Sequence, residues 1–142
     1  MPLRKCLLTL LSLLAQAAAA SEPSARDAAR QLLEHLAAGN LEAAAQLSTA
    51  PKQRYEVLRQ YRDSVGDAEF RRVFSEYPAA PAVEVARGER RLLIWRLPQG
   101  IAGQYYLRVE DRFLLDDVPS KERARLRSVL NDYRSGKLKL SD

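Results

Sequence analysis

The chain has 142 residues and a mass of 16.0 kDa, which suits one domain. Hydrophobic residues make up 46% of it and charged residues 29%, a composition that excludes both a disordered chain and a polytopic membrane protein. The chain contains one Cys, one His and no Gly-rich loop, so most metal, thiol and phosphate-binding chemistry is excluded as well.

The first twenty residues have the pattern of a secretory signal peptide. Arg4 and Lys5 form a short positive head, an apolar stretch runs over residues 7–14, and small residues follow as far as Ala20. The alternative is an uncleaved membrane anchor, but the apolar and small residues together number only 14, whereas about 20 are needed to cross a bilayer. The sequence therefore predicts cleavage after Ala20 and a periplasmic or secreted chain, residues 21–142, that forms a single α+β domain.

Export also limits the partners of the protein. Cleavage removes Cys6, so no disulfide can form in the remaining chain. It removes Arg4 and Lys5 but no acidic residue, which lowers the formal net charge of +5 by two. The resulting surface has mixed charge, and an exported chain is not expected to bind nucleic acid. Candidate partners are acidic headgroups, a small amphipathic ligand or an envelope protein, and the oligomeric state stays open.

Segments with the apolar spacing of amphipathic helices cover residues 25–38, 41–47, 52–65, 67–77 and 121–133. Ser24, Asn40 and Ser120 precede three of these segments at N-cap positions. Gly39 ends the first segment, because glycine enters the left-handed backbone region freely. The first four segments therefore predict a helical N-terminal half.

Two arginines, Arg54 and Arg62, fall within the apolar stripe of the third helix. Two explanations remain open at this point. Either the side chains extend to the rim of the stripe and leave their charges in water, or they face an anionic group at the mouth of a pocket.

The apolar period changes from helical to two near Val83. Strands are predicted over residues 83–86, 90–97, 104–110 and 112–116, with a loop over 98–102. The second strand is apolar on both faces, which is typical of a central strand covered on both sides. The predicted fold class is α+β, with N-terminal helices packed on a curved four-stranded antiparallel meander and a C-terminal helix added.

The C-terminal helix carries an apolar stripe that must be buried, because isolated helices of this length are marginal in water. It packs either on its own sheet or on a second chain. The link over residues 118–120 is short, so we expect the helix to cover the sheet face that carries Leu92, Ile94 or Tyr106.

Two local stretches add a family resemblance. Gly39 to Ala44 looks like the link between the first two helices, and residues 112–118 like the final strand, of the nuclear-transport-factor-2-like (cystatin-like) superfamily. The resemblance covers residues 25–118, and residues 52–61 are distantly similar to periplasmic lipid-carrier members. It implies that the helices and a bent sheet enclose a cone-shaped pocket. The chain departs from the family pattern by its helix after the last strand.

In such a pocket, aromatic and basic side chains would contact the ligand. The candidates are Tyr55, Tyr61, Arg62, Trp95 and Tyr105. Each aromatic residue has a simpler alternative as ordinary core filling, and Trp95 is expected in the core on the central strand.

The sequence offers little catalytic chemistry. His35 lies at the border of the first helix's apolar face and suits a boundary residue better than a general base. Asp116 and Asp117 point to opposite faces of a strand, so they cannot chelate one ion together and are expected to serve as turn and helix-start charges. Tyr105 or Tyr106 with Asp116 could imitate the acid–tyrosine pair of family isomerases. We nevertheless predict no enzyme activity, no metal and no cofactor.

The leading hypothesis is an exported, non-catalytic binding module whose cone-shaped pocket holds a small amphipathic or acidic ligand. One alternative is an envelope protein-interaction, inhibitor or accessory module whose pocket is filled by its own side chains. A second alternative is a pocket isomerase or hydrolase. The first two hypotheses differ in whether the interior is empty or filled.

Overall fold

The computed structural model describes residues 23–140, and the expected signal peptide lies outside these residues. Its fold is α+β, as predicted. The helices are α2 (Ala25–Ala37), α3 (Leu41–Ala45), α4 (Pro51–Val65), α5 (Asp67–Ser75), the short 3-10 helix η1 (Tyr77–Ala79) and α6 (Lys121–Arg134). The strands are β1 (Ala82–Arg87), β2 (Arg90–Leu97), β3 (Gly100–Val109) and β4 (Arg112–Leu115).

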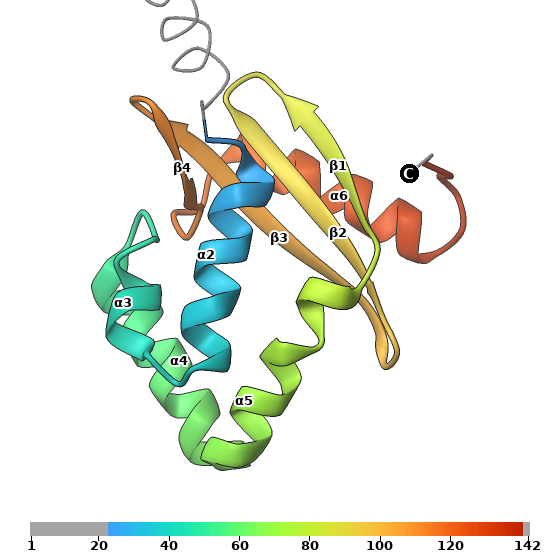
Figure 1. Ribbon diagram of the computed structural model, residues 1–142. Helices are drawn as coiled ribbons and strands as arrows, with labels where there is room; N and C mark the ends of the chain where they lie inside the picture. Colours follow the sequence, from blue (N-terminus) through green and yellow to red (C-terminus); the bar gives the residue numbers. More distant parts are fainter. Residues whose placement is uncertain (1–22, 141–142) are drawn as a thin grey trace, which may run out of the picture.

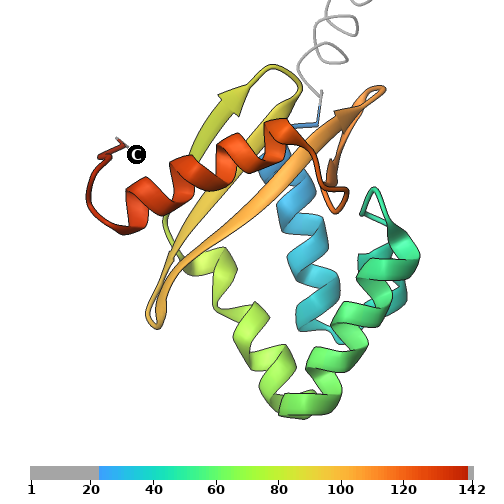
Figure 2. The ribbon, with the colours of Figure 1, turned by 180° about the vertical axis from the view of Figure 1, so that it is seen from behind.

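The strands form one antiparallel sheet in the order β1-β2-β3-β4, so the predicted meander is confirmed. Helix α2 lies against one face of this sheet and is flanked by α3, α4 and α5 (Figure 1). Helix α6 crosses the opposite face, as the reverse view shows (Figure 2). Both faces of the sheet are therefore covered by helices of the same chain.

The three predicted N-caps are all present. The Ser24 side chain accepts from the backbone N–H of Asp27, whose carboxylate accepts in return from the backbone N–H of Ser24. The side chains of Asn40 and Ser120 accept from the backbone N–H groups of Ala43 and Arg123 and so cap α3 and α6 with a single bond each. Each of these bonds joins residues three positions apart, so the sequence alone marks where the three helices begin.

The side chains of β2 alternate between two separate apolar clusters. Leu93 and Trp95 point toward α2 and join the larger cluster, which also contains Phe70. Leu92 and Ile94 point the other way and pack under α6. The C-terminal helix thus covers the sheet face that carries Leu92 and Ile94, as expected.

The prediction for Tyr106 was wrong, because this residue lies on the α2 face and not under α6. Its partner across the strands is Arg91, whereas Tyr105 is paired with Leu92. The residues opposite each other in an antiparallel pair share one face, so this register assigns Tyr106 to the α2 side. Tyr105 packs with the α6 cluster.

Strand β3 begins at Gly100, so the loop expected over residues 98–102 was too long. Only Pro98 and Gln99 form the turn, and Leu97 pairs directly with Gly100. The first half of β3 contains the small residues Ala102 and Gly103, which interrupt the alternating pattern of large apolar side chains by which strands are predicted. The reason is packing: a Cβ on Gly103 would lie 2.4 Å from Leu130 Cδ2 of α6.

None of the helices within residues 23–140 has the length and apolar character of a membrane-spanning helix.

Candidate functional site

The space between the helices and the sheet is filled by large side chains. Tyr106 is 1% exposed, and Phe70 and Leu93 are fully buried beside it. The polar groups of this interior also have partners: Trp95 Nε1 donates to Gln104 Oε1 at 2.8 Å, and the Tyr106 hydroxyl lies 3.2 Å from the same oxygen. Burial raises the pKa of Tyr106 above its ordinary value, so its phenol stays protonated. This arrangement favours a packed core where the family resemblance implies a cone-shaped pocket.

Two of the candidate pocket residues belong to one continuous series of aromatic rings. Tyr61 is 37% exposed on α4 and lies 6.2 Å from the ring of Phe74. Phe74 stacks on Tyr77 at 5.8 Å, and Tyr77 meets Trp95 edge-on at 5.6 Å. The series links the α4–α5 surface to the central strand. The expectation that Trp95 is core is confirmed.

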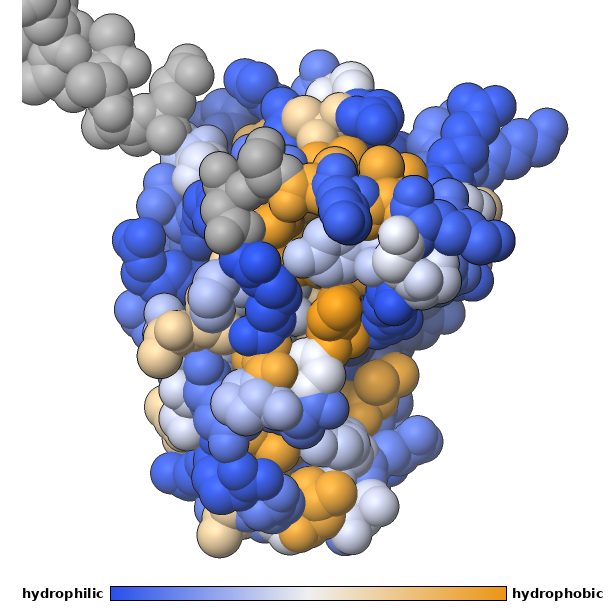
Figure 3. All heavy atoms as spheres, turned by 90° about the vertical axis from the view of Figure 1, so that its right-hand side faces the viewer, coloured by the Kyte–Doolittle hydropathy of each residue, from blue (hydrophilic) through white to orange (hydrophobic). Residues whose placement is uncertain are grey.

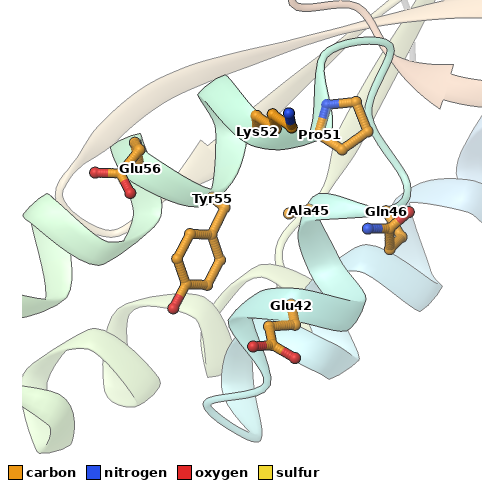
Figure 4. Close-up of a pocket in the computed structure, with 7 residues that line it drawn as sticks. All are labelled: Glu42, Ala45, Gln46, Pro51, Lys52, Tyr55 and Glu56. Carbon is orange, nitrogen blue, oxygen red and sulfur yellow. The ribbon is translucent and has the colours of Figure 1, made fainter.

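Tyr55 lines an open hollow of about 490 Å³ between α3 and α4. Its ring projects from α4 into the hollow, and Glu42 lies across from it on α3 (Figure 4). Lys52 and Glu56 complete the charged part of the lining. The volume suits a small molecule, but two carboxylates against one ammonium disfavour an acidic ligand.

The remaining two candidates lie elsewhere. Tyr105 is on the α6 face of the sheet, opposite to Trp95. Arg62 is half-buried on α4, with its guanidinium 3.9 Å from Asp63. The structure therefore brings Tyr61 and Trp95 into one aromatic series and leaves Tyr55, Arg62 and Tyr105 at separate places.

A cluster of polar side chains joins the helical layer to the end of β4. The guanidinium of Arg54 donates two hydrogen bonds to the Asp117 carboxylate, one of them at 2.8 Å. The hydroxyl of buried Ser48 donates to the same carboxylate. Of the two explanations for Arg54, the structure supports an anionic partner, but this partner is a residue of its own chain. The position of Arg54 in an apolar stripe indicated an anionic partner as one of two explanations. The sequence did not indicate that this partner is Asp117.

Asp116 and Asp117 were expected to be a helix-start charge and a turn residue, but Asp116 is buried and accepts a hydrogen bond from Arg90 on β2. Its backbone oxygen accepts from Arg123 of α6 at 3.1 Å. The adjacent acids thus bind separate arginines, as expected for carboxylates on opposite faces. Within residues 23–140, no group of three or more His, Cys, Asp or Glu side chains could hold a metal ion. These contacts make the cluster a structural tie between the layers.

Two further hollows lie beside β1, one on each face of the sheet. The hollow on the α6 face measures about 290 Å³ and is lined by Arg87, Glu122, Arg125, Leu126 and Val129. The hollow on the α2 face measures about 300 Å³ and its lining includes Arg26, Leu33, Ala82 and Trp95. Both hollows combine apolar side chains with arginines at the outer strand of the sheet.

Comparison with known proteins returns no matching family model, no similar curated protein and no similar solved structure. The protein is therefore classified by its fold alone, as an α+β protein with one antiparallel sheet between helices.

Proposed function

We propose that the protein is an exported, non-catalytic module that binds another protein through its outer surface. The filled interior carries this proposal, because the buried rings of Phe70 and Tyr106 occupy the space that a ligand would need. Export rests on the sequence of the first twenty residues. The order of helices followed by a meander is in keeping with a nuclear-transport-factor-2-like fold, which hosts interaction modules as well as carriers and enzymes.

The bonding of the acids and phenols supports a non-catalytic role. A general acid or base must be able to reach a substrate proton. The Asp116 carboxylate is instead buried against Arg90, and the Tyr106 hydroxyl lies against Gln104 inside the core. His35 is half-buried on α2. The acid–tyrosine pair of an isomerase therefore has no support in this geometry.

A second candidate function is favoured by the hollow between α3 and α4. Its size and the exposed edge of Tyr55 suit a small amphipathic ligand, held at the surface and not in a central cone. Glu42 and Glu56 favour a neutral or cationic head over an acidic one.

Native mass spectrometry of the protein purified from its source separates the two functions. The interaction module is expected to appear as a complex with a second protein. A mass increase equal to a small molecule, lost in the Tyr55→Ala variant but retained in Tyr61→Ala, would establish the second candidate instead. A bare chain with neither partner would contradict both.

A further inference from the structure

The outer edge of β1 is open, and the register shows which backbone groups face outward. Within residues 23–140, β1 pairs with β2 alone. The carbonyl oxygen of Pro81 accepts from the backbone N–H of Arg96 at 3.0 Å. Because hydrogen-bonded and outward positions alternate in an antiparallel ladder, Ala82, Glu84 and Ala86 direct their N–H and C=O groups away from the sheet.

Side chains already bond to two of the three outer carbonyls of this edge, those of Ala82 and Ala86. A guanidinium nitrogen of Arg26 donates to the carbonyl oxygen of Ala82 at 3.2 Å, and one of Arg87 donates to that of Ala86 at 2.8 Å. Both contacts are solvent-exposed, so a competing backbone can displace them. The edge of β4 differs at its C-terminal end, because Leu47 and Thr49 exchange backbone hydrogen bonds with Leu115 and cover the strand there.

The hollows beside β1 lie on opposite faces of the sheet and at different ends of the strand. The hollow on the α2 face reaches β1 at Ala82, and the hollow on the α6 face reaches it at Arg87. Side chains alternate between faces along a strand. A strand added at this edge would therefore place one of its side chains in each hollow, and these two residues would be an odd number of positions apart in its sequence. Figure 3 shows the side of the molecule on which β1 lies, where apolar residues gather between charged ones.

The charges at this edge select an acidic partner. In the described part of the chain, the arginines of the α2-face hollow contact acids: Arg30 lies 3.4 Å from Asp27, and Arg26 lies 4.0 Å from Glu84. By contrast, no carboxylate of residues 23–140 lies within 4.0 Å of the guanidinium of Arg87 or Arg125. The same hollow also carries Glu122, so two guanidinium groups stand against one carboxylate, and the excess positive charge is available to carboxylates of a second molecule.

We propose that the β1 edge docks an extended, acidic segment of a partner protein, which adds a fifth strand to the sheet and places apolar side chains in both hollows. Backbone bonds to the edge provide affinity in this mode of recognition, and the hollows provide specificity. The inference rests on the proposed interaction function and names its surface and the chemistry of its partner.

The test uses residues 21–142 and a phage-displayed library of random peptides of about twelve residues, long enough to span β1 at about 3.3 Å per residue. Enriched peptides are synthesised and titrated into the protein. Hydrogen exchange of the outward amides of Glu84 and Ala86 is followed by nuclear magnetic resonance. We expect carboxylates in the enriched peptides, apolar residues an odd number of positions apart, and slower exchange of both amides on binding.

Glu84→Pro is the decisive variant. It removes an outward N–H without breaking the β1–β2 ladder, since proline is tolerated at such edge positions. It is expected to weaken binding about tenfold or more, whereas Glu84→Gln, which keeps the N–H, leaves binding intact. Arg125→Glu weakens binding without touching the backbone, and Arg125→Lys retains most of it.

Three outcomes would overturn the inference. Peptides that bind equally well to the Glu84→Pro variant use another surface, which leaves the interaction function standing. Slow exchange of Glu84 and Ala86 in the free protein means that a second copy or the chain itself covers the edge, and dependence on protein concentration distinguishes these occupants. A library that yields no binding peptide also refutes docking of an extended segment.

Discussion

The two faces of the sheet are covered in different ways. The face toward α2 carries a deep cluster with Phe70, Trp95 and Tyr106, enclosed by several helices. The opposite face carries a thin cluster made mostly of aliphatic side chains, with α6 as its only helical cover among the described residues. Residues in the deep cluster are held from several directions, whereas the thin layer depends on a single helix.

The ionic contacts follow the same division. In the helical layer, Arg59 contacts two acids of α4, and Arg72 contacts Glu69 of α5 and Glu76 at the C-cap of that helix. Arg72 also illustrates how exposed pairs influence titration: the hydrogen bond to Glu69 raises its pKa and lowers that of the carboxyl group. On the α6 side, Arg125 has no such partner within residues 23–140. These two arginines of the helical layer are therefore paired within that layer, whereas Arg125 on the α6 side leaves its charge for a partner.

Removal of α6 has the largest expected effect. A chain that ends at Val118 exposes Val83, Val85, Leu92 and Ile94 at once, which leaves one sheet face apolar and open to aggregation. We expect this variant to aggregate or to unfold at a much lower temperature. Light scattering and thermal denaturation would measure the change.

The control for this truncation ends at Leu140, so it keeps α6 and the tail residue that packs against the same cluster. It should stay soluble and close to the full chain in stability. If the chain ending at Val118 stays monomeric and equally heat-stable, α6 is not the structural cover of the sheet.

Leu92 and Leu93 allow a direct test of the two faces, because they are neighbours on β2, both 0% exposed, and point in opposite directions. Replacing a buried leucine by alanine costs about 2–5 kcal/mol, depending on how far the surroundings close the cavity. We expect Leu93→Ala to lie near the upper end, since the deep cluster cannot collapse, and Leu92→Ala to cost about 1 kcal/mol less as α6 moves inward. Urea unfolding of both variants gives the two values. Equal losses, or a larger one at Leu92, would show that the α6 layer is as rigid as the deep cluster.

Gly103 tests how closely α6 approaches the sheet. A Cβ at this position would lie 2.4 Å from Leu130 Cδ2 and 3.2 Å from Cδ1. Gly103→Ala is therefore expected to cost about 1–3 kcal/mol through overpacking. In the double variant with Leu130→Ala, the two losses should be less than additive, because the smaller side chain makes room. Additive free energies of unfolding would mean that the two residues do not touch.

The smallest effect concerns Tyr106 at alkaline pH. Burial raises its pKa in the folded chain above the ordinary value of 10.0. Its contribution to stability is thus fully present below about pH 10 and is lost as pH rises further, because only the unfolded chain then releases the proton. The free energy of unfolding should fall by about 1.4 kcal/mol per pH unit from this group. Chemical denaturation at about pH 10 and 11 measures this change. The free energy of unfolding should fall less with pH in the Tyr106→Phe variant than in the unmodified chain, and an equal fall in both would place the phenol in contact with water.

Much of the fold could be predicted from the sequence because the signals are local. The spacing of apolar residues located the helices and strands, and Ser24, Asn40 and Ser120 marked three helix starts within one residue of the observed ones. The change to a period of two near Val83 located the meander. The double-sided apolar run of β2 indicated that both sheet faces would be covered.

Tertiary contacts decided the rest. The length of β3 depended on Leu130, whose side chain requires glycine at position 103 and so interrupts the strand's apolar pattern. The partner of Arg54 was Asp117, 63 residues away, and no local pattern identifies such a pair. The candidate pocket residues shared an aromatic or basic character, but the register of β2 and β3 sent Trp95 and Tyr105 to opposite faces. The sequence by itself thus determined the elements and their order, since propensity and period act over a few residues. Whether the interior is open and which strand edge is free were decided only by packing between distant segments, where side-chain volume and strand register act together.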